Sequence, residues 1–426
     1  MSEESLSLCF PDGTPIPEWF SHPTEEKVNG GRSFSAVEMG VLPGRPDVLQ
    51  TEKLQQAIDE VAKQGGGTLV LSAGTYLSGS LFFRPGVHLH LEKDAILLGS
   101  TEIADFALVQ TRLAGLSMNY FAALINADHC DGFTISGDGV LDGNGLPYWR
   151  HFWLRRKFNP DCHGVDEMRP RILYVSNSDD VTIKGVEIRN SPFWTTHYYR
   201  CRRLTLENLR ITSPAKPVPA PSTDAVDLDN CEYVLIRNCY LAVNDDAIAL
   251  KGGIGPDADQ RPENGANTHI LIENCTFGFC HQCLTCGSET IHNRNVIMRN
   301  CEVNGAGRVF RMKMRPDTPQ LNEYFLLSGI RGVCVDVAFV FSSWTQYCEI
   351  QEILPSSGEH ILVDNMNMVC ERVYYLAGED EFKLADIRIQ NSSFSVSSQE
   401  VTAHEGIVFQ NVSNTLRSPM KGGDGL

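Results

Sequence analysis

Three carboxylates, Asp224, Asp245 and Asp246, lie in two short segments of the chain that resemble one another. Residues 224–229 (DAVDLD) and 246–251 (DAIALK) have the same apolar positions at an offset of 22 residues. Carboxylates that are held close together cannot all be ionised cheaply, because like charges raise the pKa of one member of the group. A protonated carboxyl group beside an ionised one is the pair that general acid–base chemistry requires. This stretch therefore predicts an acid–base site.

The offset between the two segments limits the fold that could bring these carboxylates together. A strand–helix–strand unit needs about 30 or more residues, whereas one coil of a solenoid with stacked parallel strands fits an offset of 22. Adjacent strands of such a solenoid lie about 4.8 Å apart. Asp224 and Asp246 are therefore predicted to lie one above the other, with Asp245 beside them.

Two later segments continue the same register. Residues 282–287 and 308–313 align their apolar side chains with those of the first two segments. Because side chains alternate along a strand, these apolar columns are predicted to point inward. The remaining columns point outward and carry the acids toward one end and Arg311 and Lys313 toward the other. The sequence predicts one outer face with an acidic patch next to a basic patch.

The composition excludes several classes of partner. The chain has 426 residues and a formal net charge of −17. That charge argues against general binding to nucleic acids or anionic membranes, and a polyanionic substrate would need a local basic patch to receive it. No apolar run reaches the roughly 18 residues expected of a membrane span. One compact core of this length usually divides into domains, but a solenoid grows along one axis and avoids that limit.

Fourteen cysteines are present, without the regular framework of a disulfide-rich domain. Several recur in Asn-Cys pairs, which fits a small apolar side chain at a repeated interior position. The run Cys280, Cys283 and Cys286 could suggest a metal site, but strand alternation turns Cys283 away from the other two. We therefore expect neither a metal nor another cofactor.

Free thiols fit a reducing compartment, and the first residues lack the basic and apolar regions of a signal peptide. These two observations predict a cytoplasmic location. A secreted or periplasmic protein whose signal has been removed is the alternative.

In chain order, we expect an irregular lead-in over residues 1–33 and a β-solenoid domain over residues 34–426. Residues 51–63 are predicted to form an amphipathic helix that covers the open end of the solenoid, where strand edges would otherwise be unpaired. A first short strand is predicted over residues 34–40. The next strands are predicted at residues 68–71, 81–83, 87–91 and 95–98.

A motif of the form apolar-x-apolar-x-polar recurs along the rest of the chain. Its copies begin at Phe133, Val181, Leu204, Val234, Ile270, Val296, Ile361 and Ile387. The unequal intervals indicate coils of fixed size joined by loops of varying length, which is typical of a β-solenoid. An Asn at the fifth position of most copies is expected to turn the chain. Residues 144–170, 213–222 and 252–267 interrupt the rhythm, and the last two are predicted to rim the site because they flank the acidic segments.

Together these motifs resemble the polygalacturonase family, glycoside hydrolase family 28, whose members are pectin-degrading parallel β-helices. The resemblance runs from about residue 34 to the C-terminal repeats. The family's Asn-Thr-Asp, Asp-Asp and Arg-x-Lys motifs correspond to residues 222–224, 245–246 and 311–313 of this chain. The resemblance implies an all-β fold, a single-stranded right-handed parallel β-helix with an N-terminal capping helix.

The resemblance also implies a role for each site residue. Asp245 would be the general acid, and Asp224 and Asp246 would hold the attacking water as general base, with inversion at the sugar. Arg311 and Lys313 would bind a uronate carboxylate, which Arg can grip through two parallel hydrogen bonds. The implied function is hydrolysis of α-linked galacturonic acid in pectin or oligogalacturonides. The enzyme would be exo-acting if the rim loops close one end of the site.

One motif departs from the family pattern of Gly-His-Gly. Gln282 occupies the histidine position, and His281 lies one residue earlier, where strand alternation would turn it away from the site. A one-residue bulge could return His281 to the site. His197, one coil before Asp224, is a further candidate for contact with sugar, with a structural role as the alternative.

Three other functions are weighed against this one. The departure at Gln282 keeps a hydrolase of rhamnogalacturonan or another branched pectin as an alternative. A polysaccharide lyase would use the acids to bind Ca²⁺ and a basic residue to abstract a proton, and a non-catalytic solenoid would only bind sugar. The expected partner is a pectic polysaccharide or oligosaccharide in the hydrolase interpretations, and no oligomeric state is predicted.

Overall fold

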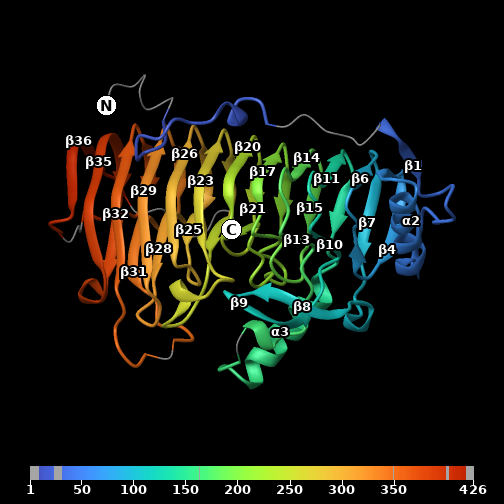
Figure 1. Ribbon diagram of the computed structural model, residues 1–426. Coiled ribbons are helices and arrows are strands. Elements are labelled where there is room, and N and C mark those ends of the chain that lie inside the picture. The colour runs from blue at the N-terminus through green and yellow to red at the C-terminus, as the bar shows by residue number, and fades with distance from the viewer. Residues whose placement is uncertain (1–8, 24–30, 163, 349, 400–402, 419–426) are drawn as a thin grey trace.

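The computed structural model describes residues 9–23, 31–162, 164–348, 350–399 and 403–418. Short parallel strands stack into an elongated solenoid, whose coils follow one another along the chain from the blue end to the red end (Figure 1). Each full coil contributes one strand to each of three columns of parallel strands. The predicted all-β parallel β-helix is confirmed.

One column carries the predicted site residues and is called the site column here. It is a sheet of ten parallel strands. In spatial order, its strands are β5 (Leu81–Phe82), β10 (Ile125–Asp128), β13 (Leu173–Ser176), β16 (Thr196–Tyr199), β19 (Val226–Asp229), β22 (Ile248–Lys251), β25 (Gln282–Cys286), β28 (Arg308–Met314), β31 (Val337–Ser343) and β34 (Arg372–Ala377).

The other two columns, called the long and the short column, join into one sheet of 24 strands because β35 pairs with strands of both. The long column consists of β1 (Ser33–Ser35), β3 (Gly67–Leu71), β6 (Val87–Leu91), β11 (Thr134–Gly137), β14 (Thr182–Lys184), β17 (Arg202–Glu207), β20 (Glu232–Arg237), β23 (Ala266–Glu273), β26 (His292–Arg299), β29 (Gln320–Ser328), β32 (Ser356–Asp364), β35 (Lys383–Val396) and β36 (Ile407–Leu416). The short column consists of β2 (Arg45–Leu49), β4 (Gly74–Ser78), β7 (Ala95–Gly99), β12 (Val140–Asp142), β15 (Glu187–Arg189), β18 (Arg210–Thr212), β21 (Tyr240–Ala242), β24 (Thr276–Phe277), β27 (Glu302–Ala306), β30 (Arg331–Cys334) and β33 (Asn367–Cys370).

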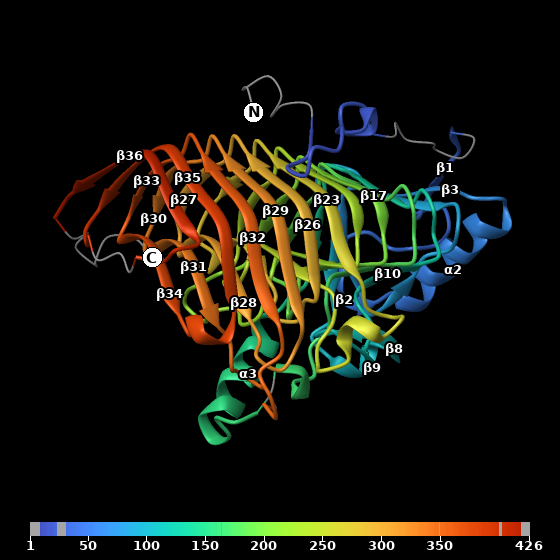
Figure 2. The same ribbon diagram turned by 60° about the vertical axis from the view of Figure 1, so that its left-hand side comes forward.

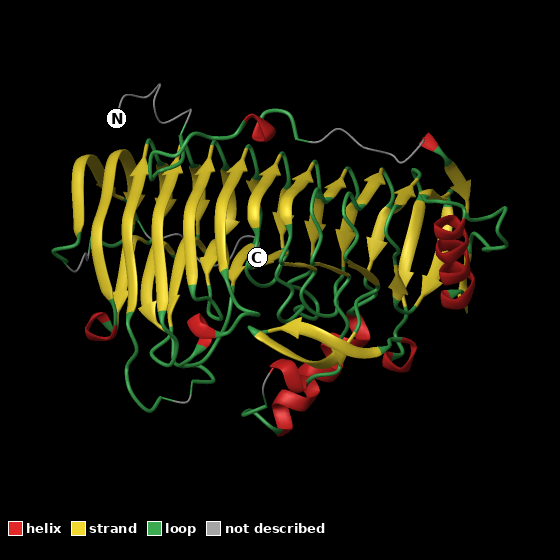
Figure 3. Ribbon diagram, viewed as in Figure 1, coloured by secondary structure: helices red, strands yellow, loops and turns green. Residues whose placement is uncertain are grey.

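The remaining elements lie outside the columns (Figure 3). Strands β8 (Leu108–Leu113) and β9 (Leu116–Phe121) form an antiparallel hairpin. The helices are η1 (Glu18–Phe20), α2 (Thr51–Lys63), η3 (Ile103–Asp105), α3 (Leu146–Phe158), η4 (Gly164–Asp166), η5 (Ala258–Gln260) and η6 (Glu379–Glu381). Among these described elements, we find no helix with both the length and the apolar character that crossing a bilayer requires.

The register of the site column confirms the predicted inward columns. Val226 pairs with Ile248, Ile248 with Leu284, and Leu284 with Phe310. All four side chains are buried in the main hydrophobic core. This stacking fixes which residues of each strand are left to face outward, and so it fixes where the site can lie.

The turns after the long column follow the predicted asparagines. Asn208, Asn238, Asn274 and Asn300 all adopt the left-handed conformation, with φ between 53° and 55°. Asn tolerates this conformation better than most residues, so it bends each coil at the same place. The structure adds a copy of the repeat at residues 325–329 to the predicted set, and it ends in Gly329, which supplies the same positive φ without an Asn.

Helix α2 spans the predicted residues and covers the N-terminal end of the solenoid (Figure 1). Its buried side chains are Leu54, Ala57, Ile58 and Val61, the apolar face seen in the sequence. The predicted strand over residues 34–40 is much shorter, because β1 ends at Ser35 and the chain then turns.

The lead-in packs against the solenoid over residues 9–23. Phe10 and Phe20 are buried against outward side chains of the long column, which include Leu235, Leu271 and Ile297. The described part of this segment passes along the opposite side of the solenoid from α3 (Figures 1 and 2). It forms η1 and contributes to the stability of the solenoid, so it is more than an irregular leader.

Candidate active site

The three predicted acids meet at the starts of neighbouring strands. Asp224 precedes β19, and Asp245 and Asp246 precede β22. The amide of Ala225 donates to the carbonyl oxygen of Asp246 at 3.0 Å, so the backbone pairing continues past the strand ends. The predicted stacking of Asp224 and Asp246 on adjacent coils is confirmed.

The acids differ in exposure. The side chain of Asp245 is 25% exposed, whereas those of Asp224 and Asp246 are 5% and 1% exposed. Asp245 is therefore the carboxyl group of the three that a ligand reaches first. This order fits the outermost group as the proton donor and the two deeper groups as its partners.

Asp246 is held by two side chains from later coils. Lys313 Nζ lies 2.7 Å from its Oδ2 atom, and the side-chain amide of Gln282 donates to its Oδ1 atom. The family motif that contains Lys313 thus lies directly beside the acids. In this structure the ammonium group neutralises Asp246, so Lys313 is a partner of the acids as well as a candidate for binding uronate.

His281 faces the site, contrary to the prediction from strand alternation. The residue precedes β25 in a bend, where alternation does not apply, and no bulge is needed. Its Nδ1 atom lies 3.4 Å from Oδ1 of Asp245, and its amide donates to the Asp245 carbonyl oxygen at 2.8 Å. Burial opposes a charged imidazole, but Asp245 outweighs that effect and raises the pKa of His281.

The pKa values of Asp224 and Asp245 are pushed apart. Burial, and next to it the charge of Asp245, raise the pKa of Asp224 to about 8. Burial also opposes ionisation of Asp245, but the hydrogen bond and charge of His281 hold the pKa of Asp245 below its usual value. In this structure the shared proton therefore lies on Asp224, whereas the predicted role of Asp245 as general acid requires a proton on Asp245.

Arg311 and Lys313 share an aromatic partner that the sequence did not indicate. The Arg311 guanidinium carbon and Lys313 Nζ each lie 4.9 Å from the ring centre of Trp344. Arg311 also donates to the hydroxyl of Ser342 at 3.4 Å, and within the described residues it forms no ion pair. Its charge is thus free to bind an anionic ligand. Trp344 follows β31 in the loop before β32, where no periodic signal could reveal it.

His197 does not fit the predicted contact with sugar. Its ring is fully buried and packs against Tyr174 and Trp194. Arg171 donates to Nδ1 at 2.6 Å, and Nε2 lies 3.5 Å from Asp229. Burial lowers the pKa of His197 to about 4, so the ring is a neutral part of the interior.

The β8–β9 hairpin lies across part of the site column. Arg112 of β8 is buried, and its Nε atom donates to Asp229 Oδ2 at 3.0 Å. At the tip, a side chain on Gly115 would come within 3.0 Å of both Gly253 and Glu289, so the hairpin touches the chain after β22 and after β25. As a result, the outward positions of β19 are buried rather than exposed as predicted.

Helix α3 joins two loops around the site. Trp153 Nε1 donates to the carbonyl oxygen of Pro219, in the proline-rich segment before Asp224, at 2.7 Å. Arg156 donates to the hydroxyl of Tyr347, which follows β31, at 3.1 Å. These contacts agree with the prediction that the proline-rich loop borders the site. They add a helix that the sequence pattern did not predict.

The acids could in principle hold a cation, since ligand atoms of Asp245, Asp246 and His281 lie within 4.8 Å of one another. Asp246 already pairs with the ammonium of Lys313 and the amide of Gln282. A divalent ion would have to displace these two groups or bind next to the positive charge of Lys313. The geometry therefore favours acid–base chemistry over metal binding.

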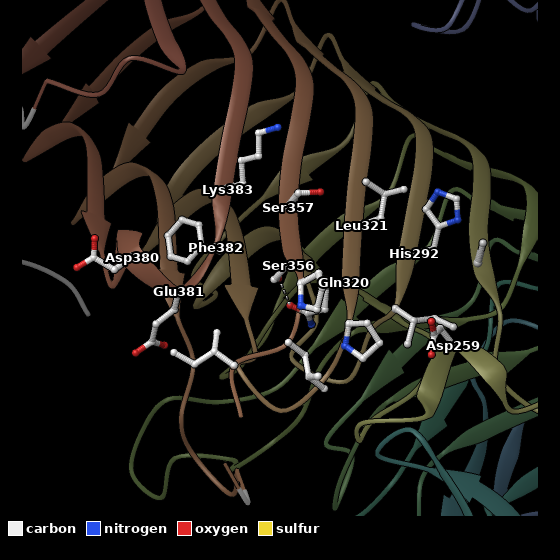
Figure 4. Close-up of a pocket in the computed structure, with 16 residues that line it drawn as sticks. Asp259, His292, Gln320, Leu321, Ser356, Ser357, Asp380, Glu381, Phe382 and Lys383 are labelled. Carbon is white, nitrogen blue, oxygen red and sulfur yellow. Dashed lines mark hydrogen bonds between the residues drawn. The ribbon is translucent and has the colours of Figure 1, made fainter. Parts of the chain in front are cut away.

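A pocket of about 770 Å³ lies elsewhere on the molecule (Figure 4). Its lining includes His292, Gln320, Ser356 and Lys383, from β26, β29, β32 and β35. None of the predicted site residues lines it. The candidate site is accordingly defined by the charged side chains of the site column, and this pocket is separate from it.

The geometry described above agrees with a comparison against known families. The sequence model of Glycosyl hydrolases family 28 matches residues 95–320, more than half of the chain. The chain belongs to glycosyl hydrolases family 28. The matched residues contain all three acids and Gln282, and they extend through Arg311 and Lys313.

Relatives within the family carry polygalacturonase names. A probable polygalacturonase of Vitis vinifera is 29% identical over 232 residues, which cover 52% of this chain and 44% of the relative. An exopolygalacturonase of Zea mays is 24% identical over 233 residues, with 54% and 52% covered. The chain thus spans about half the length of these curated relatives.

Solved structures support the fold over almost the whole chain. An exopolygalacturonase from Thermotoga maritima superimposes with a TM-score of 0.76 at 21% identity, covering 92% of this chain and 93% of the other. A polygalacturonase from Erwinia carotovora gives a TM-score of 0.69 at 21% identity, with 93% and 96% covered. The family's solenoid is therefore present from the capping helix to the last coils.

Proposed function

We propose that this member of family 28 is an inverting glycoside hydrolase that cleaves α-linked galacturonic acid residues in pectin or oligogalacturonides. One observation carries the proposal: the exposed acid Asp245 lies beside the Asp246–Lys313 ion pair, with the unpaired guanidinium of Arg311 two residues from Lys313. An acid–base group next to a free cation suits a sugar that carries its own carboxylate. The polygalacturonase names of the relatives support the same substrate class.

In the proposed reaction Asp245 gives its proton to the leaving glycosidic oxygen. A water molecule attacks the anomeric carbon from the opposite face and loses a proton to Asp224, which acts together with Asp246. The proton must first move from Asp224 to Asp245. A uronate carboxylate bound beside Asp245 favours this shift, because a nearby negative charge raises the pKa of the closest acid.

Arg311 is the proposed anchor of the uronate carboxylate. Its guanidinium is held against the face of Trp344, which limits its motion and leaves its donors available to a ligand. Lys313 contributes positive potential, although its shortest contact is to Asp246. This arrangement supports recognition of a negatively charged sugar despite the net charge of −17.

We further propose an exo-acting enzyme. The support is the β8–β9 hairpin, which Arg112 fastens to Asp229 and Asn264, the latter in the predicted rim loop. A buried ion pair close to the tip of the hairpin keeps it in place, and a fixed hairpin across the strands before β22 obstructs a long polymer on that side. Short products released from one chain end are then expected.

His281 affects the choice between substrates. The branched-pectin alternative rests on the missing family histidine, but His281 contacts Asp245 and offers an imidazole at that point. A lyase would use the acids to bind Ca²⁺, and Asp246 already pairs with Lys313. Both observations favour galacturonan hydrolysis over these alternatives.

Product analysis tests the proposal. The purified protein is incubated with polygalacturonate, oligogalacturonides and rhamnogalacturonan, and products are separated by chromatography. Saturated galacturonic acid, released early as the main product from the first two substrates, is expected, with little product from the third. Ultraviolet-absorbing unsaturated products would instead favour a lyase, and release only from rhamnogalacturonan would favour the branched-pectin hydrolase.

A further inference from the structure

A buried lysine lies behind the acids. Lys251, the last residue of β22, has a side chain that is only 5% exposed. Its Nζ atom lies 3.7 Å from Asp224 Oδ2, 3.7 Å from Asp227 Oδ1 and 3.3 Å from Glu289 Oε2. It also lies 4.7 Å from the ring centre of Trp194. One cation therefore faces three carboxyl groups from two segments, residues 224–227 and the turn after β25.

The ammonium group is fixed in this place. Besides its ion pairs, it donates to the carbonyl oxygen of Gly287 at 3.4 Å. The opposite charges around it outweigh the cost of burial, and they raise the pKa of Lys251 above its ordinary value. A buried lysine in such surroundings stays charged over the whole range in which carboxyl groups titrate.

Asp227 differs from the other carboxyl groups near Lys251. It is fully buried, and within the described chain neither of its oxygens has a hydrogen-bond partner. Burial, followed by the charge of Asp224, raises the pKa of Asp227 well above the ordinary value and so favours its neutral form. Because the neutral form of Asp227 is favoured, Asp224 and Glu289 are the main partners for the charge of Lys251.

Glu289 competes with Asp224 for the lysine. Burial opposes its ionisation, but Lys251, and next Arg315, lower the pKa of Glu289 to about 2. It is therefore ionised wherever the enzyme is folded and active. The charged groups that act on this cluster are Asp224, Asp227, Asp245, Asp246, Glu289, Arg171, Lys313 and Arg315.

We propose that Lys251 is a positioning residue whose buried charge favours the ionised form of Asp224, so that Asp224 acts as the base and the shared proton is directed to Asp245. The inference rests on the proposed function, because it specifies which carboxyl group of that same site gives up the shared proton and which one receives it. Lys251 does not contact the reacting atoms. It acts through Asp224, at 3.7 Å.

The sign of the effect follows from the charges. Burial and Asp245 raise the pKa of Asp224, while Lys251 lowers it. A variant without this cation has a base that ionises at higher pH. The acidic limb of the pH profile, which reports ionisation of the base, must then move upward. Removal of the negative charge of Glu289, which competes with Asp224 for Lys251, must move the acidic limb to lower pH.

The test measures kcat/KM on oligogalacturonides from pH 4 to 9 for the wild type, Lys251→Met, Lys251→Arg and Glu289→Gln. We expect the acidic limb of Lys251→Met to rise by about one pH unit or more, with activity recovering at high pH. Lys251→Arg is expected to keep the wild-type limb, and Glu289→Gln to lower it. Lys63→Met, in the capping helix α2, serves as a charge-removal control with an unchanged profile.

The proposal is overturned if Lys251→Met loses activity equally at every pH or keeps an unshifted limb. Thermal unfolding identifies a variant that fails to fold; if Lys251→Met does so, Glu289→Gln decides, and an unshifted or raised limb counts against the proposal. A wild-type protein that releases no galacturonic acid would refute the proposed function itself. The two failures are therefore distinguishable.

Discussion

The outer faces of the site column and the long column consist of the same kind of short parallel strand, but they carry opposite chemistry. On the site column the outward positions hold ionisable groups, such as Asp227, Lys251 and Arg311. On the long column the corresponding outward positions hold Leu235 and its neighbours on adjacent coils, which are covered by the lead-in. The inward residues of both columns form one apolar core.

This difference shows how the solenoid separates stability from function. Stacked apolar side chains inside each coil hold the backbone whatever the outward residues are, so one face can carry buried charges at a cost to stability. The other face stabilises the same coils by apolar burial. Substitutions on the two faces should therefore affect different measured quantities.

The largest expected effect comes from Asp245→Asn on the charged face. Asn cannot donate a proton to the leaving oxygen, so kcat on oligogalacturonides should fall about 10³-fold, with little change in thermal unfolding. Asp138→Asn, an exposed carboxylate in the turn before β12, is the matched control and should keep wild-type activity. Retention of more than about one tenth of the activity by Asp245→Asn would contradict its role as general acid.

Arg112→Met should have the next largest effect, on stability. The Arg112–Asp229 pair is almost completely buried, and removal of one partner leaves an uncompensated charge. We expect a loss of about 3 kcal/mol in the free energy of unfolding, measured with denaturant, and longer products if the hairpin detaches. Arg331→Met breaks an exposed pair with Glu302 and should cost less than about 1 kcal/mol. Equal effects of the two variants would argue against a buried anchor.

Phe10→Ala changes the opposite face. The ring is buried against the outward leucines of the long column, and its loss should lower the free energy of unfolding by about 2 kcal/mol. Activity at a temperature where the variant is folded should be unchanged, because the substitution leaves the site column intact. Phe158→Ala removes an exposed ring and serves as the control. A drop in kcat for Phe10→Ala would show that the two faces are coupled.

The smallest effect expected is a pH-dependent gain in stability for Asp224→Asn. The pKa of Asp224 is about 8 in the fold and 3.8 in the unfolded reference, so the folded chain holds a proton that the unfolded chain releases. The stability from this group is complete below pH 4 and is lost as the pH rises toward 8. The Asn side chain does not ionise, so Asp224→Asn avoids this loss of stability. Its Tm should therefore be higher than that of the wild type by about 1–3 °C at pH 9 and unchanged at pH 3.5. A gain of equal size at both pH values would contradict the raised pKa.

The coil register and capping helix could be predicted because both leave a periodic apolar signal. Val226 and Ile248 repeat at matching positions of successive strands, and the apolar residues of α2 share one face. Helix α3 gave no such signal, since its aromatic and basic residues are spread around the whole helix. A helix whose contacts are made by loops and single side chains is therefore missed by a search for apolar stripes.

The candidate site was predictable only as far as the register of the coils determines it. The acids and Lys313 follow the strand register, and the structure brings them together. His281 was misplaced because alternation stops at the strand end. The burial of His197 and the position of Trp344 depend on loops far away in the sequence, whose lengths no repeat determines.

The attachment of the lead-in has a consequence for the order of events during synthesis. Phe10 and Phe20 leave the ribosome before the coils on which they pack, because the surface that receives them is supplied by Leu235, Leu271 and Ile297 on successive coils. Until those coils have formed, both aromatic rings lack their final binding surface. This segment is thus made before the coils that hold it, and it can dock only after the central coils have formed.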